Sequence, residues 1–395
     1  MLDILKIALV FTAILVLLRL KWNIGYVLLV ASGLLAALYL MPFPAIASTL
    51  RSTVTDIVTI KLFFALTLIR SLEMVLREKE VLARMMEASR NLLKRKKAVI
   101  ISMPMLIGLL PSLGGAYFSA PMVDESTKGL AMSAEEKGFI NYWFRHPWEY
   151  VSPLYPGILL ASAITAIELR NLMLANMTYA VIIFATGFIF SMRGLKGEFT
   201  KKAKIEKKEL WSFLPVSLIL VMVMAFGIEL YYALGFTIAG LFLFYRVGIK
   251  DIFRTLKHGF ALEVIVLIFG AMLFKFAMEN SGAVVHLSRY FTEKGIPLLP
   301  ILFMLPFISG LLTGLTVGFV GGTFPLILSL AGGAHLNEIT FAFASGFVGV
   351  LLSPVHLCFV LTREYFKADV AGIYKKTIPG CAMIMAGALA VYFIL

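Results

Sequence analysis

The chain has 395 residues, of which 60% are hydrophobic and 15% are charged, and its mean hydropathy is +0.91. Soluble domains are about 45–50% apolar and about 25% charged, so the composition excludes an ordinary soluble protein and favours a membrane protein. The net charge is 36 − 23 = +13, which we attribute to cytoplasmic loops and not to nucleic-acid binding. Cys358 and Cys381 lie in apolar runs and predict neither a disulfide nor a metal site.

Five spans are predicted in the first half, with an amphipathic stretch and a hairpin between the third and the fourth. The spans are expected at about 4–18, 24–42, 56–72, 138–165 and 171–192, with a loop at Pro42 and Pro44. Charges at helical spacing over 77–97 predict a helix in the membrane interface. The Gly- and Pro-rich segment from Pro104 to Pro121 is too short to cross twice, so a re-entrant hairpin is expected at about 99–130.

The second half is predicted to follow the same plan. Its spans are expected near 211–228, 231–246, 259–278, 337–361 and 376–395, with an amphipathic piece at 283–293 and a hairpin at about 299–332. In each half the span after the hairpin contains a Ser-Pro pair, at Ser152 and at Ser353. Proline removes a helical hydrogen bond, so both spans should be broken there. The chain therefore divides into a first repeat (1–193), a basic linker (194–208) and a second repeat (209–395).

Matching landmarks in the two halves indicate an internal repeat. Pro104-x3-Gly108-Leu-Leu corresponds to Pro306-x3-Gly310-Leu-Leu. Each motif continues into a Gly-rich tip, then a proline, then Glu136 or Glu338, and finally the Ser-Pro pair. Two halves with five crossings each must insert with opposite topology, which is the inverted repeat typical of secondary transporters. Basic clusters at 77–97, 193–208, 246–257 and 363–376 place the linker in the cytoplasm and both termini outside.

The hairpin tips and the helix breaks are the candidate binding regions. Both expose backbone groups without helical partners, and glycine lets backbone approach a ligand closely. The candidate residues of the two half-sites are Ser112, Gly114, Gly115, Ser119 and Ser152, and Thr313, Thr316, Gly318, Gly321, Thr323 and Ser353. The alternative is that the glycines only allow tight helix packing and the hydroxyls bond locally.

The first broken helix also carries the most specific polar cluster, which comprises Asn141, Arg145, His146, Trp148 and Glu149. Ionisable residues inside a membrane are costly and indicate a site or a pathway. We expect Arg145, with Asn141, to bind an anionic group and His146 or Glu149 to carry a proton. In the second half only His356, just after the break, is a further candidate to carry the coupling proton or cation. The alternative is a structural pair between Arg145 and Glu149.

Paired hairpins, paired broken helices and five-plus-five halves resemble the ion transporter superfamily, which includes gluconate, lactate, citrate and C4-dicarboxylate permeases. The resemblance covers nearly the whole chain and is greatest to an uncharacterised prokaryotic family. It implies a homodimer in the cytoplasmic (inner) membrane. The sodium-dicarboxylate branch has Ser-Asn-Thr at its tips, where this chain has Ser112-Leu-Gly114 and Thr313-Gly-Leu-Thr316. The resemblance therefore leaves the substrate and the coupling ion, H⁺ or Na⁺, open.

The predicted fold is thus an all-α polytopic membrane protein with two inverted repeats. The predicted function is secondary transport of a small organic anion, with no cofactor unless Na⁺ is bound. No HExxH, GxSxG or Walker motif occurs in the sequence, so an enzyme is not expected. A channel or a lipid-headgroup flippase is the alternative, and an intramembrane hydrolase using Ser112 or Ser119 with His146 is the weakest one.

Overall fold

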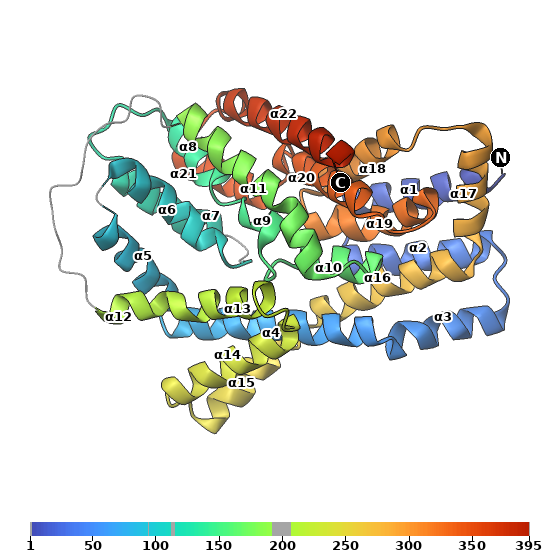
Figure 1. The fold of residues 1–395 in the computed structure, drawn as a ribbon, viewed down its shortest axis with the longest axis horizontal. Coiled ribbons are helices and arrows are strands. Elements are labelled where there is room, and N and C mark those ends of the chain that lie inside the picture. Colours follow the sequence, from blue (N-terminus) through green and yellow to red (C-terminus); the bar gives the residue numbers. More distant parts are fainter. Residues whose placement is uncertain (1, 94, 112–114, 192–206, 395) are drawn as a thin grey trace.

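The computed structural model describes residues 2–93, 95–111, 115–191 and 207–394 (Figure 1). Helices account for 82% of the structure, and no strand occurs in these ranges. The predicted all-helical fold is therefore confirmed, and its several apolar helices are consistent with a membrane protein. Ser112, Gly114 and most of the predicted linker lie outside the described residues.

The first half contains eleven of the helices in the described ranges. They are α1 (Leu2–Arg19), α2 (Ile24–Leu38), α3 (Phe43–Thr55), α4 (Ile57–Glu78), α5 (Val81–Leu92), α6 (Lys96–Gly108), α7 (Gly115–Ser126), α8 (Ala134–Trp143), α9 (Trp148–Val151), α10 (Pro156–Thr165) and α11 (Leu169–Ser191). Helices α6 and α7 occupy the predicted first hairpin, and α8 to α10 occupy the broken span.

The second half has the same order of a helix pair followed by an interrupted helix. Its elements are α12 (Lys207–Leu210), the 3₁₀ turn η1 (Trp211–Phe213), α13 (Leu214–Met224), α14 (Leu230–Phe244), α15 (Ile249–Gly259), α16 (Leu262–Asn280), α17 (Ala283–Lys294), α18 (Leu299–Thr313), α19 (Thr316–Ala331), α20 (Leu336–Leu351), α21 (Leu357–Phe366) and α22 (Val370–Ile394). Helices α18 and α19 occupy the predicted second hairpin, and α20 and α21 follow as the interrupted pair.

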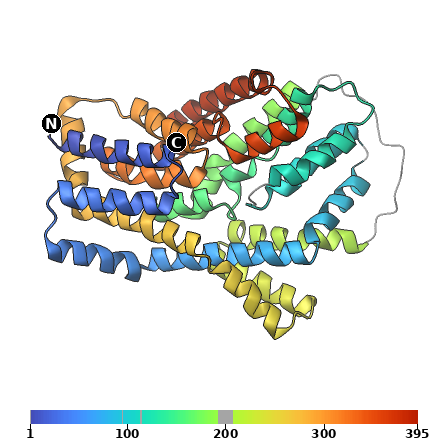
Figure 2. The same ribbon diagram turned by 180° about the vertical axis from the view of Figure 1, so that it is seen from behind.

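The two halves interleave rather than forming separate bodies (Figures 1 and 2). Helix α16 packs against α2 and α3, α15 and α14 pack against α4, and α22 packs against α11 and α8. Helix α10 of the first broken span packs against α19 of the second hairpin. The interrupted helices of one half therefore lie next to the hairpin of the other.

Among the described residues, three stretches are long and apolar enough to cross a membrane by length and composition, namely Leu169–Ser191, Ile249–Asn280 and Val370–Ile394. The pair α3 and α4, which is bent by 45°, would add a fourth. Six further apolar helices in the described ranges have 10–17 residues. A span of about 20 residues is usual. Ten crossings would therefore require several of these shorter helices to span in combination or at reduced length.

Two local expectations were wrong. The segment after Pro42 is not a loop but helix α3, because Pro44 stands in its first turn, where a missing N–H costs nothing. The first broken span is interrupted twice, at 144–147 as well as at 152–155. The earlier interruption coincides with Pro147, whose ring disfavours a helical conformation at His146. Because of the interruption at 144–147, His146 and Glu149 do not lie on one continuous helix with α8.

Glycines at corresponding positions of the two halves make the same close contact. A Cβ atom on Gly108 would lie 2.3 Å from the carbonyl oxygen of Arg145, and one on Gly310 would lie 2.1 Å from that of Gly346. Any side chain would clash at these distances, so glycine is required for the approach. Each hairpin's first helix is thereby held directly against the interrupted helix that follows it.

Candidate functional site

The candidate site lies where the two interrupted helices meet. The first is interrupted at Ser152 and the second at Ser353, and both side chains are buried. Ser152 Oγ accepts from the Leu154 N–H at 3.3 Å, and Ser353 Oγ accepts from the Val355 N–H at 3.4 Å. Each serine therefore satisfies backbone freed by its own break. Local bonding of these hydroxyls was the alternative interpretation of the sequence.

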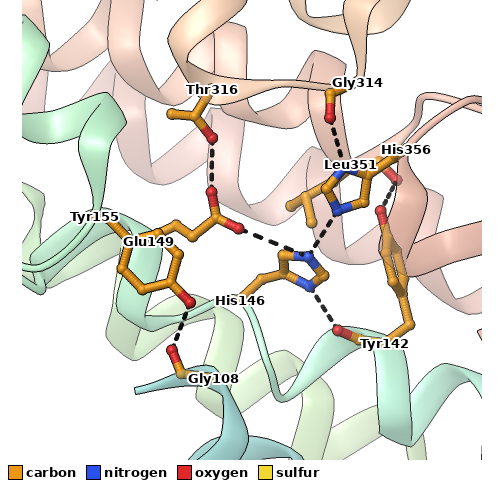
Figure 3. A network of polar contacts seen from close by, with 9 residues as sticks. All are labelled: Gly108, Tyr142, His146, Glu149, Tyr155, Gly314, Thr316, Leu351 and His356. Atoms are coloured by element: carbon orange, nitrogen blue, oxygen red, sulfur yellow. Dashed lines mark hydrogen bonds and ion pairs between the residues drawn. The ribbon is translucent and has the colours of Figure 1, made fainter. Parts of the chain in front are cut away.

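Two histidines, one from each half, face each other across these breaks (Figure 3). His146 precedes α9 and His356 is the N-cap residue of α21, and their Nε2 atoms are 3.0 Å apart. His146 Nδ1 lies 2.6 Å from the Tyr142 carbonyl oxygen, and His356 Nδ1 lies 2.6 Å from that of Gly314. A carbonyl oxygen can only accept, so both Nδ1 atoms must carry the proton. The hydrogen bonds thus fix both rings with their Nε2 atoms directed at each other.

Glu149 connects the first break to the second hairpin. Its Oε2 accepts from Thr316 Oγ1 at 2.6 Å, at the start of α19. Its Oε1 lies 3.9 Å from His146 Nε2, and the side chain is 13% exposed (Figure 3). Three predicted residues, His146, Glu149 and Thr316, are therefore brought together. Glu149 and Thr316 are 167 residues apart, and no feature of the sequence predicted their contact.

Two tyrosines beside the cluster donate hydrogen bonds to backbone carbonyls. Tyr142 donates to the Leu351 carbonyl at 2.9 Å, at the end of α20. Tyr155 donates to the Gly108 carbonyl at 2.5 Å, at the end of α6. Tyr155 and His356 stand at the same place after their Ser-Pro pairs, and each bonds a carbonyl in the hairpin of its own half. Neither tyrosine was predicted from the sequence, although both lie within four residues of predicted site residues.

Asn141 forms a second polar group one turn before His146. Its Oδ1 accepts from Ser119 Oγ at 2.6 Å, and its Nδ2 donates to the Ala116 carbonyl at 3.0 Å and to Thr362 Oγ1 at 2.9 Å. The side chains of Asn141, Ser119 and Thr362 are all buried. The predicted residues Ser119 and Asn141 thus meet, and their bonds join α7, α8 and α21. This arrangement supports a structural link between the first hairpin and both interrupted helices.

The remaining predicted residues of the second hairpin form local contacts. Thr313 Oγ1 accepts from the Leu315 N–H at 3.2 Å, and Thr323 Oγ1 donates to the Phe319 carbonyl of its own helix at 2.6 Å. Gly318 faces Thr313, whose Oγ1 would lie 2.8 Å from an added Cβ. Gly115 is buried at the start of α7. Among these residues no bond to the histidine pair is seen.

Arg145 and Cys358 complete the buried surroundings of the histidines. Arg145 is 4% exposed and lies close to Cys358. The ligand atoms of His146, His356 and Cys358 all lie within 4.8 Å of one another. The apolar neighbours of Cys358 in the sequence did not predict a site there. The His356-x-Cys358 spacing, next to a break, was the available signal.

Two cavities in the described part of the chain lie away from the histidines, at the end of α10. One of about 510 Å³ is lined by Lys61, Ala166 and Glu229, and one of about 620 Å³ is lined by Ala166, Lys275 and Glu279. Neither is lined by the histidines, which are almost fully buried. We place the candidate site at the cluster nevertheless, because ionisable groups are buried there at the cost of desolvation. The structure therefore presents an enclosed site with separate cavities at one end of α10.

Comparison with known proteins supplies a family but no activity. No curated protein matches the chain. Nothing found connects it with the ion transporter superfamily, so that resemblance stays a prediction. The expectation of an uncharacterised family is confirmed. A family model described as "Protein of unknown function (DUF401)" matches residues 4–395, nearly the whole chain, and the chain therefore belongs to this family.

Proposed function

We propose that this chain is a proton-coupled secondary transporter of a small organic anion in a prokaryotic cytoplasmic membrane, built from two inverted repeats. The observation that carries the proposal is the buried contact between His146 and His356, next to Glu149, where the interrupted helices of both halves meet. Ionisable residues in a membrane interior favour a substrate or proton pathway. Secondary transporters place their sites on discontinuous helices at the interface of two repeats.

Proton accounting at the histidine pair supplies a coupling mechanism. Both Nδ1 atoms donate to carbonyls, so a neutral pair would direct two Nε2 lone pairs at each other across 3.0 Å. One additional proton converts this repulsion into an Nε2–H···Nε2 hydrogen bond. Protonation therefore favours contact between the two halves, and loss of the proton favours their separation. This is a two-state element that a proton gradient can bias.

The anionic substrate class rests on Arg145. Its guanidinium is buried in the same cluster, and its fork matches a carboxylate in geometry. A small organic anion is the ligand that would balance this charge when the site is open. A channel is less well supported, since the histidines and Arg145 are enclosed and line neither large cavity.

Transport in liposomes tests the proposal. The purified chain would first be screened with small organic anions by thermal shift, where a ligand at about 100 times its Kd adds about 2.7 kcal/mol. Uptake of the best anion would then be measured with and without an imposed pH gradient. We expect uptake to require the gradient in the wild type and in Cys381→Ser. The coupling should be lost in Glu149→Gln and in His356→Gln. Uptake that ignores the gradient, or coupling that persists in both variants, would overturn the proposal.

Thr316→Val should have a smaller effect on uptake than Glu149→Gln. It keeps the shape of the side chain and removes the hydroxyl that donates to Glu149. A hydrogen bond to a charged group is worth about 1.5–3 kcal/mol, so we expect a shifted pH dependence of uptake and a partial loss of rate. Thr313→Val is the matched control, because that hydroxyl bonds only to Leu315 among the described residues. Equal effects of the two variants would argue against a role for Glu149 in coupling.

A further inference from the structure

We propose that His146, His356 and Cys358, with Glu149, form a binding site for a transition-metal ion of the Zn²⁺ type. The ligand atoms of His146, His356 and Cys358 lie within 4.8 Å of one another, and these three residues are buried. Imidazole and thiolate ligands select transition metals over Na⁺, Mg²⁺ or Ca²⁺, which prefer oxygen. The set is assembled from both halves of the chain, because His146 belongs to the first break and the other two belong to the second.

The hydrogen bonds of the histidines are those of preorganised ligands. A metal-binding histidine almost always donates its other ring N–H to a carbonyl or a carboxylate, which fixes the tautomer. Both Nδ1 atoms here donate to carbonyls, of Tyr142 and Gly314, at 2.6 Å. The two Nε2 atoms are therefore left without their own proton and are directed at each other across 3.0 Å. An ordinary buried histidine pair has no need for this arrangement on both rings.

The distances fit a single ion after small side-chain movements. With Zn–N of about 2.0–2.1 Å and Zn–S of about 2.3 Å, tetrahedral ligands lie about 3.3 Å (N to N) and about 3.6 Å (N to S) apart. The Nε2 atoms are 3.0 Å apart, slightly less than this, and Cys358 Sγ is within 4.8 Å of both. Glu149 Oε1, 3.9 Å from His146 Nε2, is placed to be the fourth ligand.

The charges of the site also favour a cation. A metal-bound cysteine is a thiolate, and with the Glu149 carboxylate it supplies two negative charges. Arg145 near Cys358 adds one positive charge, so these groups sum to −2 + 1 = −1. Tyr142, whose ring contacts both histidine rings, donates its hydroxyl proton to the Leu351 carbonyl and adds no charge. The ion would take the place of the proton between the two imidazoles. It would thereby hold the two interrupted helices together, which goes beyond the proposed transport cycle and does not depend on it.

Metal binding to the full chain in detergent tests the site directly. The protein would be stripped with a chelator, shown to be folded by size exclusion, and titrated with Zn²⁺ alone and with Co²⁺ alone. We expect one tightly bound ion per chain and, with Co²⁺, the near-ultraviolet charge-transfer band of a cobalt–thiolate bond. This spectrum is read in the unmodified protein, so it does not rely on a variant that folds.

Variants then identify the ligands. Cys358→Ser should remove the thiolate band, and His356→Gln should weaken Zn²⁺ binding by at least about tenfold. Cys381→Ser is the matched control, a second buried cysteine on α22 outside the cluster, and should leave both readouts unchanged. A folded wild type that binds no stoichiometric Zn²⁺ would overturn the proposal, as would a band that survives in Cys358→Ser. Because transport is not measured, this failure is distinguishable from failure of the proposed function.

Discussion

The two interrupted helices share a backbone plan and differ in their side chains. The first has Asn141, Arg145, His146 and Glu149, and the corresponding residues of the second are Ala342, Gly346, Phe347 and Val350. Both contain a Ser-Pro pair, both turn a serine hydroxyl onto local backbone, and both are approached by a hairpin glycine. The first half therefore supplies most of the charge, whereas the second supplies apolar enclosure and a single His-x-Cys segment.

Packing shows what the second half gains from this difference. Besides Gly310 against Gly346, a Cβ on Gly349 would lie 2.2 Å from the Phe307 carbonyl oxygen. Helices α18 and α20 thus touch backbone to backbone at two levels, while the first half has the larger Arg145 where α20 has Gly346. A tightly packed partner is suited to stay fixed while the more polar one changes its contacts. The site therefore depends on both halves, since neither holds a complete set of polar groups.

The largest effect should come from filling the tightest of these contacts. Gly310→Ala places a methyl group 2.1 Å from the Gly346 carbonyl oxygen, where only a backbone shift can make room. Overpacking costs about 1–3 kcal/mol and occasionally more, and here we expect the upper end of this range. The thermal midpoint in detergent should fall by several degrees or the protein should fail to fold.

Gly240→Ala is the control for this substitution. Nothing lies within 4 Å of a Cβ at Gly240, inside α14, so alanine should be neutral or stabilise by up to about 1 kcal/mol. Gly108→Ala tests the first half in the same way, because its clash with Arg145 is at 2.3 Å. If Gly108→Ala were tolerated while Gly310→Ala was not, the first half would be the more adaptable one. Tolerance of both would contradict the packing argument.

The sequence predicted those features that depend on short-range chemistry. Ser-Pro pairs marked both main interruptions, and the landmarks around Gly108 and Gly310 marked two hairpins whose glycines make equivalent contacts. Pro147 was equally visible, and its effect on His146 was overlooked. The contact between His146 and His356 could not be predicted, because it depends on how helices 210 residues apart pack. Cys358 was missed for the same reason, since an apolar neighbourhood in sequence does not show which polar groups a fold brings beside it.

A medium effect should come from the polar link at Asn141. Asn141→Ala removes three hydrogen bonds and leaves the buried Ala116 carbonyl without this donor. A hydrogen bond contributes about 0.5–1.5 kcal/mol net, so we expect the loss of three bonds to destabilise the protein by about 2–3 kcal/mol in thermal unfolding.

Asn176→Ala is the matched control for a buried asparagine. Among the described residues Asn176 makes one hydrogen bond, to the Tyr150 carbonyl at 3.3 Å, so its loss should cost about 1 kcal/mol. A larger effect at Asn176 than at Asn141 would show that the Asn141 bonds do not hold the first hairpin to the interrupted helices.

The smallest effects should come from the two serines, and they compare the halves most directly. Ser152→Ala and Ser353→Ala each remove one bond from a hydroxyl to a backbone N–H, at 3.3 and 3.4 Å. A neutral hydrogen bond contributes about 0.5–1.5 kcal/mol, and these are long, so we expect a loss of about 0.5–1 kcal/mol for each. We expect equal losses, since each hydroxyl bonds the same backbone position in its own turn. Unequal losses in thermal unfolding would mean that one serine has a further partner. Equal losses of stability with unequal losses of anion uptake would indicate that one of the two serines contacts the substrate. The serine with the larger loss of uptake would then show on which side of the cluster the substrate binds.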